Sequence, residues 1–160
     1  MAKERLERTL KRMAYQMLEL AQDDQVALVG LNERGQIVAK YLKQIIDRIS
    51  GENQGVSTLI HLNIDDPSNK PEPLYSELAG NNISIFIVDD VIFSGLTMLK
   101  ALKKLGSLPE EKPVYTAVLV DRGHRRVPIQ ASITGIEIPT KFDEQVEFRH
   151  SNNKPASVVL

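Results

Sequence analysis

Two adjacent carboxylates, Asp89 and Asp90, follow an apolar run and precede a turn that contains serine, glycine and threonine. The apolar run 83–88 is typical of a buried strand, and Ser94-Gly95-Leu96-Thr97 leads into a helical pattern. A helix N-terminus carries free backbone N–H groups and therefore attracts phosphate. Carboxylates repel a phosphate, but they accept hydrogen bonds from both hydroxyls of a vicinal diol. The pattern therefore indicates a ligand with a phosphate beside a ribose diol.

The same residues also allow a plainer interpretation. On a strand, Asp89 and Asp90 point to opposite faces, so both reach one ligand only where the strand has ended. Alternatively, the two acids cap the next helix or lie in solvent, and Thr97 is an N-cap. Gly95 allows the backbone to approach a phosphate closely, and Ser94 and Thr97 supply hydroxyl donors. The spacing between the acids and this turn favours the ribose-phosphate interpretation.

A second polar segment, Asn32-Glu33-Arg34-Gly35, follows the apolar run 25–31. We expect a turn between a strand and a helix at this place. Arg34 at the start of a helix, with Gly35 beside it, is consistent with a second anion site. The alternative is an ordinary turn with Arg34 in solvent.

A third polar segment begins at Asp121 and continues through Arg122, Gly123, His124 and Arg125. Its concentration of arginine and histidine suggests an anionic or planar polar ligand. Composition alone favours a solvated basic loop, and a subunit contact is one place where such a loop occurs. Both interpretations stay open at this level.

Apolar strands alternate with amphipathic helices along the chain. Helical spacing predicts helices at 3–22, 37–49 and 98–105. Strands are predicted at 25–31, 56–64, 83–88 and 114–120, with weaker candidates at 133–138 and 145–148. This order predicts an α/β domain with a central, mostly parallel sheet flanked by helices. Since such sheets bind ligands at the C-terminal ends of their strands, the three polar segments should converge on one site.

The bulk composition narrows the class of protein. The 160 residues suggest a single domain, 1–160, and a net charge of −1 gives no global attraction for nucleic acid. The absence of cysteine excludes disulfides and thiolate metal sites. No signal-peptide pattern or membrane-spanning run is present, so we expect a cytoplasmic protein. The irregular segment 65–82, which is long for a compact domain, is expected to be a functional flap or a disordered excursion.

The stretch 83–97 resembles the phosphoribosyl-pyrophosphate-binding loop of the type I phosphoribosyltransferases. Within that family, the segment 119–125, followed by Pro128-Ile129, Gly135 and Ile138-Pro139-Thr140, is very similar to one branch. This branch contains the bifunctional pyrimidine-operon regulators and uracil phosphoribosyltransferases. In it, the segment forms a small hood that recognises the uracil base. The resemblance covers most of the chain, in the family's order and at similar spacing.

The resemblance implies an enzyme that transfers ribose 5-phosphate from phosphoribosyl pyrophosphate to a nucleobase, here uracil, giving UMP and pyrophosphate. It implies that Asp89 and Asp90 hold the ribose diol and its developing positive charge, and that Arg34 and Gly35 contact pyrophosphate. The implied 5-phosphate residues are Phe93, Ser94, Gly95, Leu96 and Thr97. The implied base residues are Asp121, Arg122, Gly123, His124 and Arg125.

The resemblance also implies a cofactor and an oligomeric state. Mg²⁺ would arrive with the pyrophosphate substrate, held by substrate oxygens and waters, with Asp90 or Asp121 nearby. No dedicated protein metal site is expected, because His61, His124 and His150 lack metal-ligand spacing. A homodimer or higher homo-oligomer is implied, and no membrane partner.

Departures from the family pattern affect the pyrophosphate side of the site. Asn32-Glu33 stands where relatives carry Lys-Thr, and Leu62-Asn63-Ile64-Asp65-Asp66 stands where they carry a Tyr-Arg-Asp-Asp flap. Leu96 replaces the arginine of the phosphate turn, as in other branches. Cationic donors of this kind are worth a few kcal/mol in a transition state. We therefore expect normal UMP binding and slow turnover.

The alternative function is a UMP-sensing, RNA-binding regulator of pyrimidine genes with weak or no catalysis, and a simple ribose-phosphate-binding module is a third possibility. Helical spacing places Arg5, Arg8 and Arg12 on one face, which could contact RNA phosphates. Glu4 and Glu7 balance that face, and the family's usual histidine is replaced by a tyrosine at position 15. RNA binding is therefore not the favoured interpretation.

Overall fold

The computed structural model describes residues 1–51, 56–67, 76–152 and 154–159. Its centre is a five-stranded sheet of order β2-β1-β3-β4-β5, in which every neighbouring pair of strands is parallel. The strands are β1 Gln25–Leu31, β2 Val56–Leu62, β3 Ile83–Ile92, β4 Val114–Asp121 and β5 Ile133–Glu137. The α/β class with a parallel sheet, as expected from the sequence, is confirmed.

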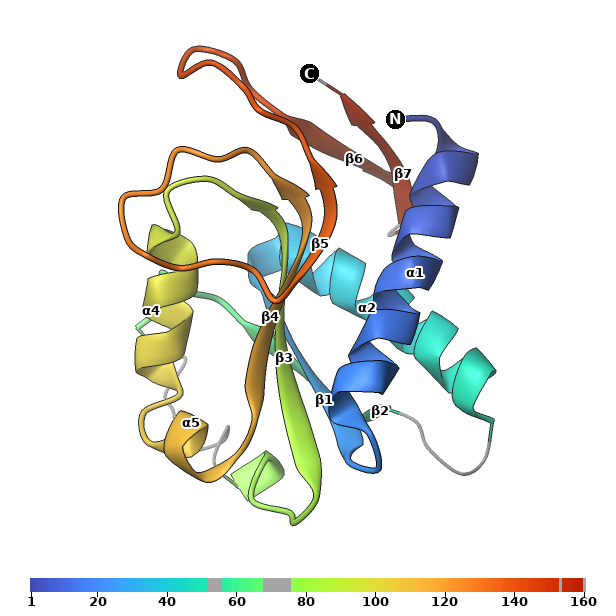
Figure 1. Cartoon of the computed structure of the whole chain (residues 1–160), viewed down its shortest axis with the longest axis vertical. Coiled ribbons are helices and arrows are strands. Elements are labelled where there is room, and N and C mark those ends of the chain that lie inside the picture. Colours follow the sequence, from blue (N-terminus) through green and yellow to red (C-terminus); the bar gives the residue numbers. More distant parts are fainter. Residues whose placement is uncertain (52–55, 68–75, 153, 160) are drawn as a thin grey trace.

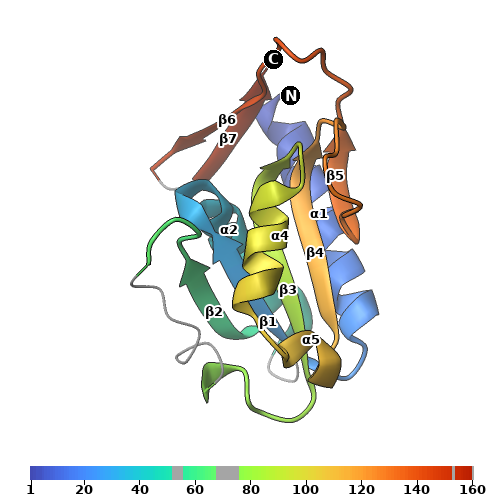
Figure 2. The ribbon, with the colours of Figure 1, turned by 90° about the vertical axis from the view of Figure 1, so that its left-hand side faces the viewer.

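Helices cover both faces of this sheet. Helices α1 (Lys3–Ala21) and α2 (Asn32–Ser50) lie on one face, and α4 (Leu96–Lys104) and α5 (Leu108–Glu111) lie on the other (Figures 1 and 2). A hairpin of β6 (Glu147–Ser151) and β7 (Lys154–Val159) forms a separate antiparallel pair. This hairpin lies beside the start of α1, where the N-terminal ammonium donates to the Val158 carbonyl (Figure 1).

The strands feed two separate cores because successive side chains point to opposite faces. On β3, Phe86 and Val88 join the core under α1 and α2, whereas Ile85 and Ile87 join the core under α4. The central strands are buried on both faces, which explains their continuous apolar runs. Helix α1 contributes residues three and four apart, and its fully buried large side chains are Leu6, Leu10, Met13 and Met17.

Several boundaries differ from the sequence prediction. Strand β3 does not end before the two acids but continues to Ile92, because Asp89 and Val91 pair with Val118 and Val120 of β4. Asn32–Gly35 is not a turn but the first turn of α2, with Asn32 at φ 53°. Strand β7 and the short helix α5 were not predicted, since neither stands out from its polar surroundings in the sequence.

The predicted loop 65–82 lies partly outside the described residues, since 68–75 are not described. Of the helices in the described part of the chain, none combines the length and the apolar character needed to cross a membrane. The described residues include the sheet and the helices on its two faces. These elements position the polar segments identified in the sequence.

Gly135 tests how closely α1 packs on β5. A Cβ atom at this position would clash with the Leu119 carbonyl oxygen and would lie 3.1 Å from Met13 Sδ and Thr9 Cγ2. We predict that Gly135→Ala lowers the free energy of unfolding by about 1–3 kcal/mol, the usual cost of overpacking. Thr134→Ala, next to it on the opposite face of β5, serves as the control and should cost less. Equal losses in denaturant titrations of the two variants would contradict the close approach.

Candidate functional site

The three polar segments meet at the C-terminal edge of the sheet. A cavity of about 370 Å³ is lined from α2 by Asn32, Glu33 and Arg34, and from the end of β3 and the start of α4 by Asp89, Asp90, Val91 and Thr97. A second cavity of about 240 Å³ shares Asp89, Val91 and Thr97 with it and extends to Phe93, Ser94 and Gly95. The two cavities are therefore parts of one continuous depression at the end of β3.

The carboxylates of Asp89 and Asp90 both border this depression although both residues remain in strand β3. Asp89 is buried, and its Oδ1 accepts a hydrogen bond from the Asp90 backbone N–H at 2.9 Å. Burial, together with the charge and side chain of Asp90, raises the pKa of Asp89 well above its usual range. The Asp90 side chain is 13% exposed, so it offers the more accessible carboxylate.

Gly35 allows the first turn of α2 to pack against β3. A Cβ atom there would lie 2.7 Å from the Val88 carbonyl oxygen and 3.1 Å from Asp89 Oδ1. The glycine interpreted from the sequence as a ligand contact is thus required by the protein's own backbone. In the same turn, Asn32 Oδ1 accepts a hydrogen bond from the Ile64 N–H at 3.0 Å, which connects α2 to the segment after β2.

Arg34 and Glu33 bring opposite charges to the mouth of the larger cavity. Arg34 Nη1 lies 4.0 Å from Asp90 Oδ2, with the Arg34 side chain 52% exposed. A pair this exposed contributes little to stability, so the guanidinium is available to an anionic ligand. Glu33 is also exposed, in the first helical turn, where the helix dipole favours a carboxylate. Arg34 therefore attracts an anion that enters the cavity, and Glu33 repels it.

The turn at Ser94–Thr97 opens α4, as the sequence predicts. Gly95 is the N-cap residue, with φ 84°, and no side-chain hydrogen bond caps the helix. Thr97 therefore lies inside the helix and is not its N-cap. Ser94 Oγ accepts a hydrogen bond from the Leu96 N–H at 3.3 Å. The uncapped N-terminus leaves donors for an anion in the smaller cavity.

Gly95 also meets the segment that follows β4. A Cβ atom on Gly95 would lie 3.0 Å from Val127 Cγ2, and its positive φ already disfavours a side chain. The Ser94 carbonyl accepts a hydrogen bond from the Arg126 N–H at 2.9 Å. The glycine predicted to approach a phosphate therefore makes room for the protein's own segment 125–129 as well.

Arg125 joins this segment to the rest of the site. Its Nη2 donates to Asp121 Oδ2 at 2.6 Å, its Nη1 to the Phe93 carbonyl at 2.9 Å and its Nε to the Ile129 carbonyl at 2.7 Å. With its side chain 15% exposed, the guanidinium faces protein atoms. Sequence reasoning placed Arg125 beside a base; in the structure its guanidinium is bonded to protein atoms, and Arg125 also lines a cavity of about 280 Å³ with Asp121, Arg122 and Gly123.

The carboxylate of Asp121 is likewise engaged by other groups of the protein. Burial alone would raise its pKa, but the hydrogen bonds from Arg125 and from the Gly123 N–H outweigh that effect and hold the pKa of Asp121 below its usual value. Both carboxylate oxygens therefore already have donors. Gly123 itself adopts φ 78° and has open space around it.

An aromatic cluster lies on the outer side of the same loop, and sequence analysis missed one of its members. The His124 ring lies 4.3 Å from that of Phe142 and 5.3 Å from that of Phe93, centroid to centroid. The Arg122 guanidinium lies over the Phe93 ring at 4.5 Å. Phe142 is 79% exposed, the most exposed large apolar side chain described. In the sequence, Phe142 is distinguished only as a single aromatic residue in a polar segment.

Arg122 and His124 hold this loop in place. Arg122 Nε donates to Thr140 Oγ1 at 3.0 Å, and its Nη2 donates to the Glu144 carbonyl. His124 Nε2 contacts the Thr140 carbonyl, and His124 adopts φ 60°. The segment 140–144 is thus fixed to the loop after β4, which presents the Phe142 ring to solvent beside Phe93.

One of the two carboxylates named from the sequence opens on a cavity where a ligand could carry a cation. Within the described residues, no three histidine, cysteine or acidic side chains gather as a metal site. Of the two carboxylates named from the sequence, Asp121 has both oxygens engaged, while Asp90 opens on the larger cavity. Mg²⁺ commonly binds through one carboxylate, waters and substrate phosphates. Asp90 is therefore better placed than Asp121 to lie near a Mg²⁺ ion that a ligand carries.

Comparisons with known proteins identify a family for this chain. The family described as phosphoribosyl transferase domain matches residues 2–150. The Bifunctional protein PyrR of Ligilactobacillus salivarius is 38% identical over 150 residues, which cover 88% of this chain and 84% of the relative. The protein of the same name from Streptomyces coelicolor is 34% identical over 160 residues, covering 96% and 83%.

A solved hypoxanthine-guanine phosphoribosyltransferase from Bacillus anthracis has the same fold, with a TM-score of 0.65 at 21% identity, covering 99% of this chain and 94% of that one. At this identity the likeness concerns the fold.

Asp89→Asn tests the cost of the buried carboxylate. The folded-state pKa is raised, so the contribution of Asp89 to stability is complete below its unfolded pKa and is lost as the pH rises through the folded pKa. We predict that the variant melts about 2 °C or more above the wild type at pH 8, and that the difference disappears toward about pH 4. Asp90→Asn is the control and should change less. A lower melting temperature for Asp89→Asn at pH 8 would contradict the assignment.

Proposed function

Because the chain belongs to the phosphoribosyl transferase domain family, we propose that it transfers ribose 5-phosphate from phosphoribosyl pyrophosphate to uracil, giving UMP and pyrophosphate. One observation carries this proposal: a buried carboxylate, a second accessible carboxylate and an uncapped helix N-terminus border the same depression. A diol and a phosphate joined through one ribose match these three groups. The name of the relatives, Bifunctional protein PyrR, supports the phosphoribosyltransferase branch named from the sequence.

The reaction breaks the bond between the ribose anomeric carbon and a pyrophosphate oxygen, and forms a bond from that carbon to a base nitrogen, which loses its proton. Positive charge develops on the ribose in the transition state. Asp89 and Asp90 would hold the diol and stabilise that charge, while Phe93 to Thr97 would bind the 5-phosphate at the start of α4. The protein acts by positioning and electrostatics.

Arg34 would contact the departing pyrophosphate from the mouth of the larger cavity. Mg²⁺ would come with the substrate and neutralise part of the pyrophosphate charge, with Asp90 nearby. The flap expected to cover this side falls partly in 68–75, outside the described residues. Support for the pyrophosphate side therefore rests on Arg34 and Asp90.

The base would lie against the loop after β4. In this proposal Phe93 and Phe142 offer apolar ring surface, Gly123 offers open backbone, and Arg122 and His124 keep the segment 140–144 in place. Asp121 and Arg125 then act indirectly, as the braced pair behind the loop. A single domain spanning 1–160, a cytoplasmic location and a homodimer complete the proposal.

The second candidate is a UMP-sensing, RNA-binding regulator, and the word bifunctional in the relatives' name supports keeping it. The basic face of α1, however, is smaller than its sequence suggests. Arg12 donates to the carbonyls of Thr134 and Gly135 and to Gln16, so it is engaged with β5 and its own helix. The transferase proposal therefore remains the favoured one.

The proposal is tested by measuring pyrophosphate release from phosphoribosyl pyrophosphate and Mg²⁺ with each nucleobase in turn. Release with uracil and none with purines supports it. Release with a purine would change the substrate, and UMP binding without release from any base would favour the regulator.

Thr97→Asp tests the 5-phosphate site. It places a carboxylate in the first turn of α4, where the expected ligand is an anion. We predict that the affinity for UMP, measured by calorimetry, falls at least tenfold, which is about 1.4 kcal/mol. Thr97→Ser keeps the hydroxyl and should bind nearly as the wild type does. UMP binding that is unchanged in Thr97→Asp would refute the site.

Glu33→Thr tests the pyrophosphate side. The substitution removes a negative charge from the mouth of the cavity where charge develops on the leaving group. We predict faster turnover of uracil with little change in UMP affinity. Glu33→Gln, which removes the charge but keeps the length of the side chain, should accelerate turnover in the same direction. A slower rate in both variants would mean that Glu33 assists the reaction.

A further inference from the structure

Asn32, the first residue of α2, adopts a left-handed backbone conformation at the edge of the larger cavity. Its φ of 53° is costly for most side chains and comparatively easy for asparagine. The residue follows β1 directly and lines the cavity of about 370 Å³ together with Glu33 and Arg34. The backbone alone accounts for an asparagine or a glycine at this position, so any role of the carboxamide comes in addition.

One hydrogen bond determines how the Asn32 carboxamide is turned. Its Oδ1 lies 3.0 Å from the Ile64 nitrogen, and because a backbone N–H only donates, the amide oxygen must face it. Ile64 is itself buried in the core under α4. The same segment is held by Lys104 of α4, whose Nζ donates to the Asp66 carbonyl at 3.4 Å. The acceptor side of the carboxamide is therefore fixed to a well-packed part of the chain.

The nitrogen of this carboxamide, Nδ2, remains available to a ligand. Within the described residues no hydrogen bond engages it, and it is not one of the buried polar atoms that lack a partner. Nδ2 is therefore accessible, and it lies on the side of the amide group that faces away from the Ile64 N–H. Since Asn32 lines the larger cavity, this side offers N–H donors to a ligand there.

We propose that Asn32 binds the anionic group in the larger cavity by donating from Nδ2 to one of its oxygens. Arg34, in the same helical turn, brings a cation to this cavity, so an oxyanion satisfies both residues. In the proposed reaction this group is pyrophosphate, and in that respect the inference rests on the proposed function. A neutral amide that is already oriented before the ligand arrives loses little entropy on binding.

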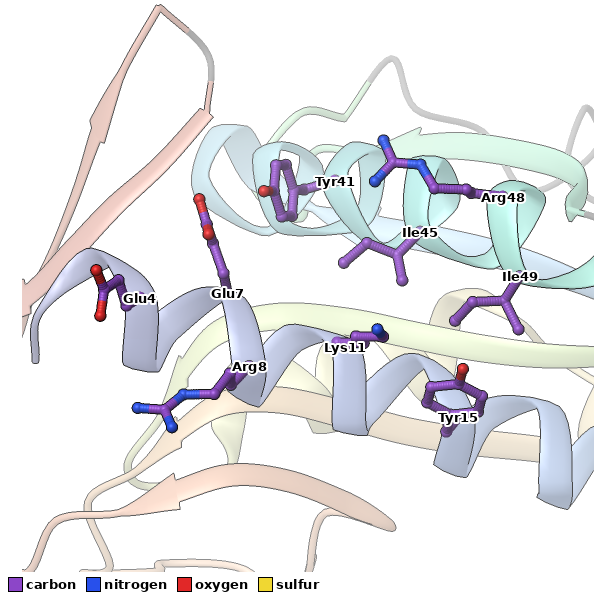
Figure 3. A pocket seen from close by; sticks show the side chains of 9 residues that line it. All are labelled: Glu4, Glu7, Arg8, Lys11, Tyr15, Tyr41, Ile45, Arg48 and Ile49. Carbon is purple, nitrogen blue, oxygen red and sulfur yellow. The ribbon is translucent and has the colours of Figure 1, made fainter.

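The groove between α1 and α2 is a second place where a small anion would meet basic side chains. It has a volume of about 720 Å³, and its basic members are Arg8, Lys11 and Arg48. Figure 3 shows that the guanidinium groups of Arg8 and Arg48 lie well apart from each other. Glu4 and Glu7 line the same groove and would repel an anion. The groove is therefore the poorer anion site, and the experiment controls for it.

Two variants of Asn32 separate the amide nitrogen from the other roles of the residue. Asn32→Asp tolerates the same backbone and keeps an oxygen for the Ile64 N–H, but it replaces Nδ2 with a charged oxygen. Asn32→Gly also tolerates the backbone and adds no charge, but it loses the bond to Ile64. Nδ2 is the one polar group that both variants lose.

We expect both variants to bind pyrophosphate at least tenfold more weakly than the wild type, because each loses a hydrogen bond to a charged group. The measurement is calorimetry of the full chain with pyrophosphate and Mg²⁺. The affinity for UMP should stay within about twofold, because UMP lacks the group that the larger cavity takes. The KM for phosphoribosyl pyrophosphate should rise in the same two variants.

Asn82 provides matched controls. It has a similar φ of 58° but precedes β3, at the opposite end of the sheet from Asn32. Asn82→Asp and Asn82→Gly carry the same chemical changes and should bind pyrophosphate as the wild type does. Arg48→Ala removes a cation from the groove and should also leave this affinity unchanged. Circular dichroism and thermal melting verify that every variant is folded.

The remaining outcomes overturn the inference, each for a different reason. Weaker binding in Asn32→Asp alone means that the added charge acts by repulsion. Weaker binding in Asn32→Gly alone means that the residue serves only to hold Ile64. Unchanged binding in both variants, or a wild type that does not bind pyrophosphate, means that the amide is not used. A loss in Arg48→Ala places the anion in the groove.

The inference and the proposed activity can fail separately. A wild-type chain that binds pyrophosphate through Asn32, yet releases none from phosphoribosyl pyrophosphate with any base, overturns the transferase and keeps this binding residue. A wild-type chain that turns over uracil, and is unaffected by either Asn32 variant, keeps the activity and overturns the inference.

Discussion

The structure is organised around a carboxylate buried at the end of its central strand. Taking Asp89 out of water is costly, and the raised pKa of this residue is the direct expression of that cost. Several features can be understood as support for it. The Asp90 N–H donates to it, Gly35 lets α2 approach it without a clash, and the ladder to β4 keeps β3 extended past it. Strongly perturbed pKa values of this kind cluster at functional sites.

In the loop after β4, the polar side chains described above bond mostly to other parts of the protein. Arg125 and Asp121 brace the loop from behind, and Arg122 and His124 hold the segment 140–144. The exposed parts of this region include the Phe142 ring and the open backbone at Gly123. The arginine-rich composition suggested guanidinium groups that face a ligand, but those of Arg122 and Arg125 are bonded to protein atoms.

The sequence predicted the architecture well because the architecture depends on local periodicity. The buried strands and the amphipathic faces of α1 and α2 repeat at intervals visible in one window of sequence. The details of the site depend on distant partners. Continuation of β3 to Ile92 requires β4, engagement of Arg125 requires Phe93 and Ile129, and the position of Phe142 requires His124. None of these pairings leaves a periodic signal, so they became visible only in the folded chain.

The first turn of helix α2 lies at the buried acid, and its last turn lies at the groove lined by α1 and α2. Its first turn packs through Gly35 against Asp89, and its last turn carries Arg48 and Ile49 to the groove beside α1. Its 19 residues, at about 1.5 Å each, form a rod roughly 28 Å long. One continuous helix therefore connects the backbone around the buried acid, at its first turn, with the groove lined by α1 and α2, at its last turn.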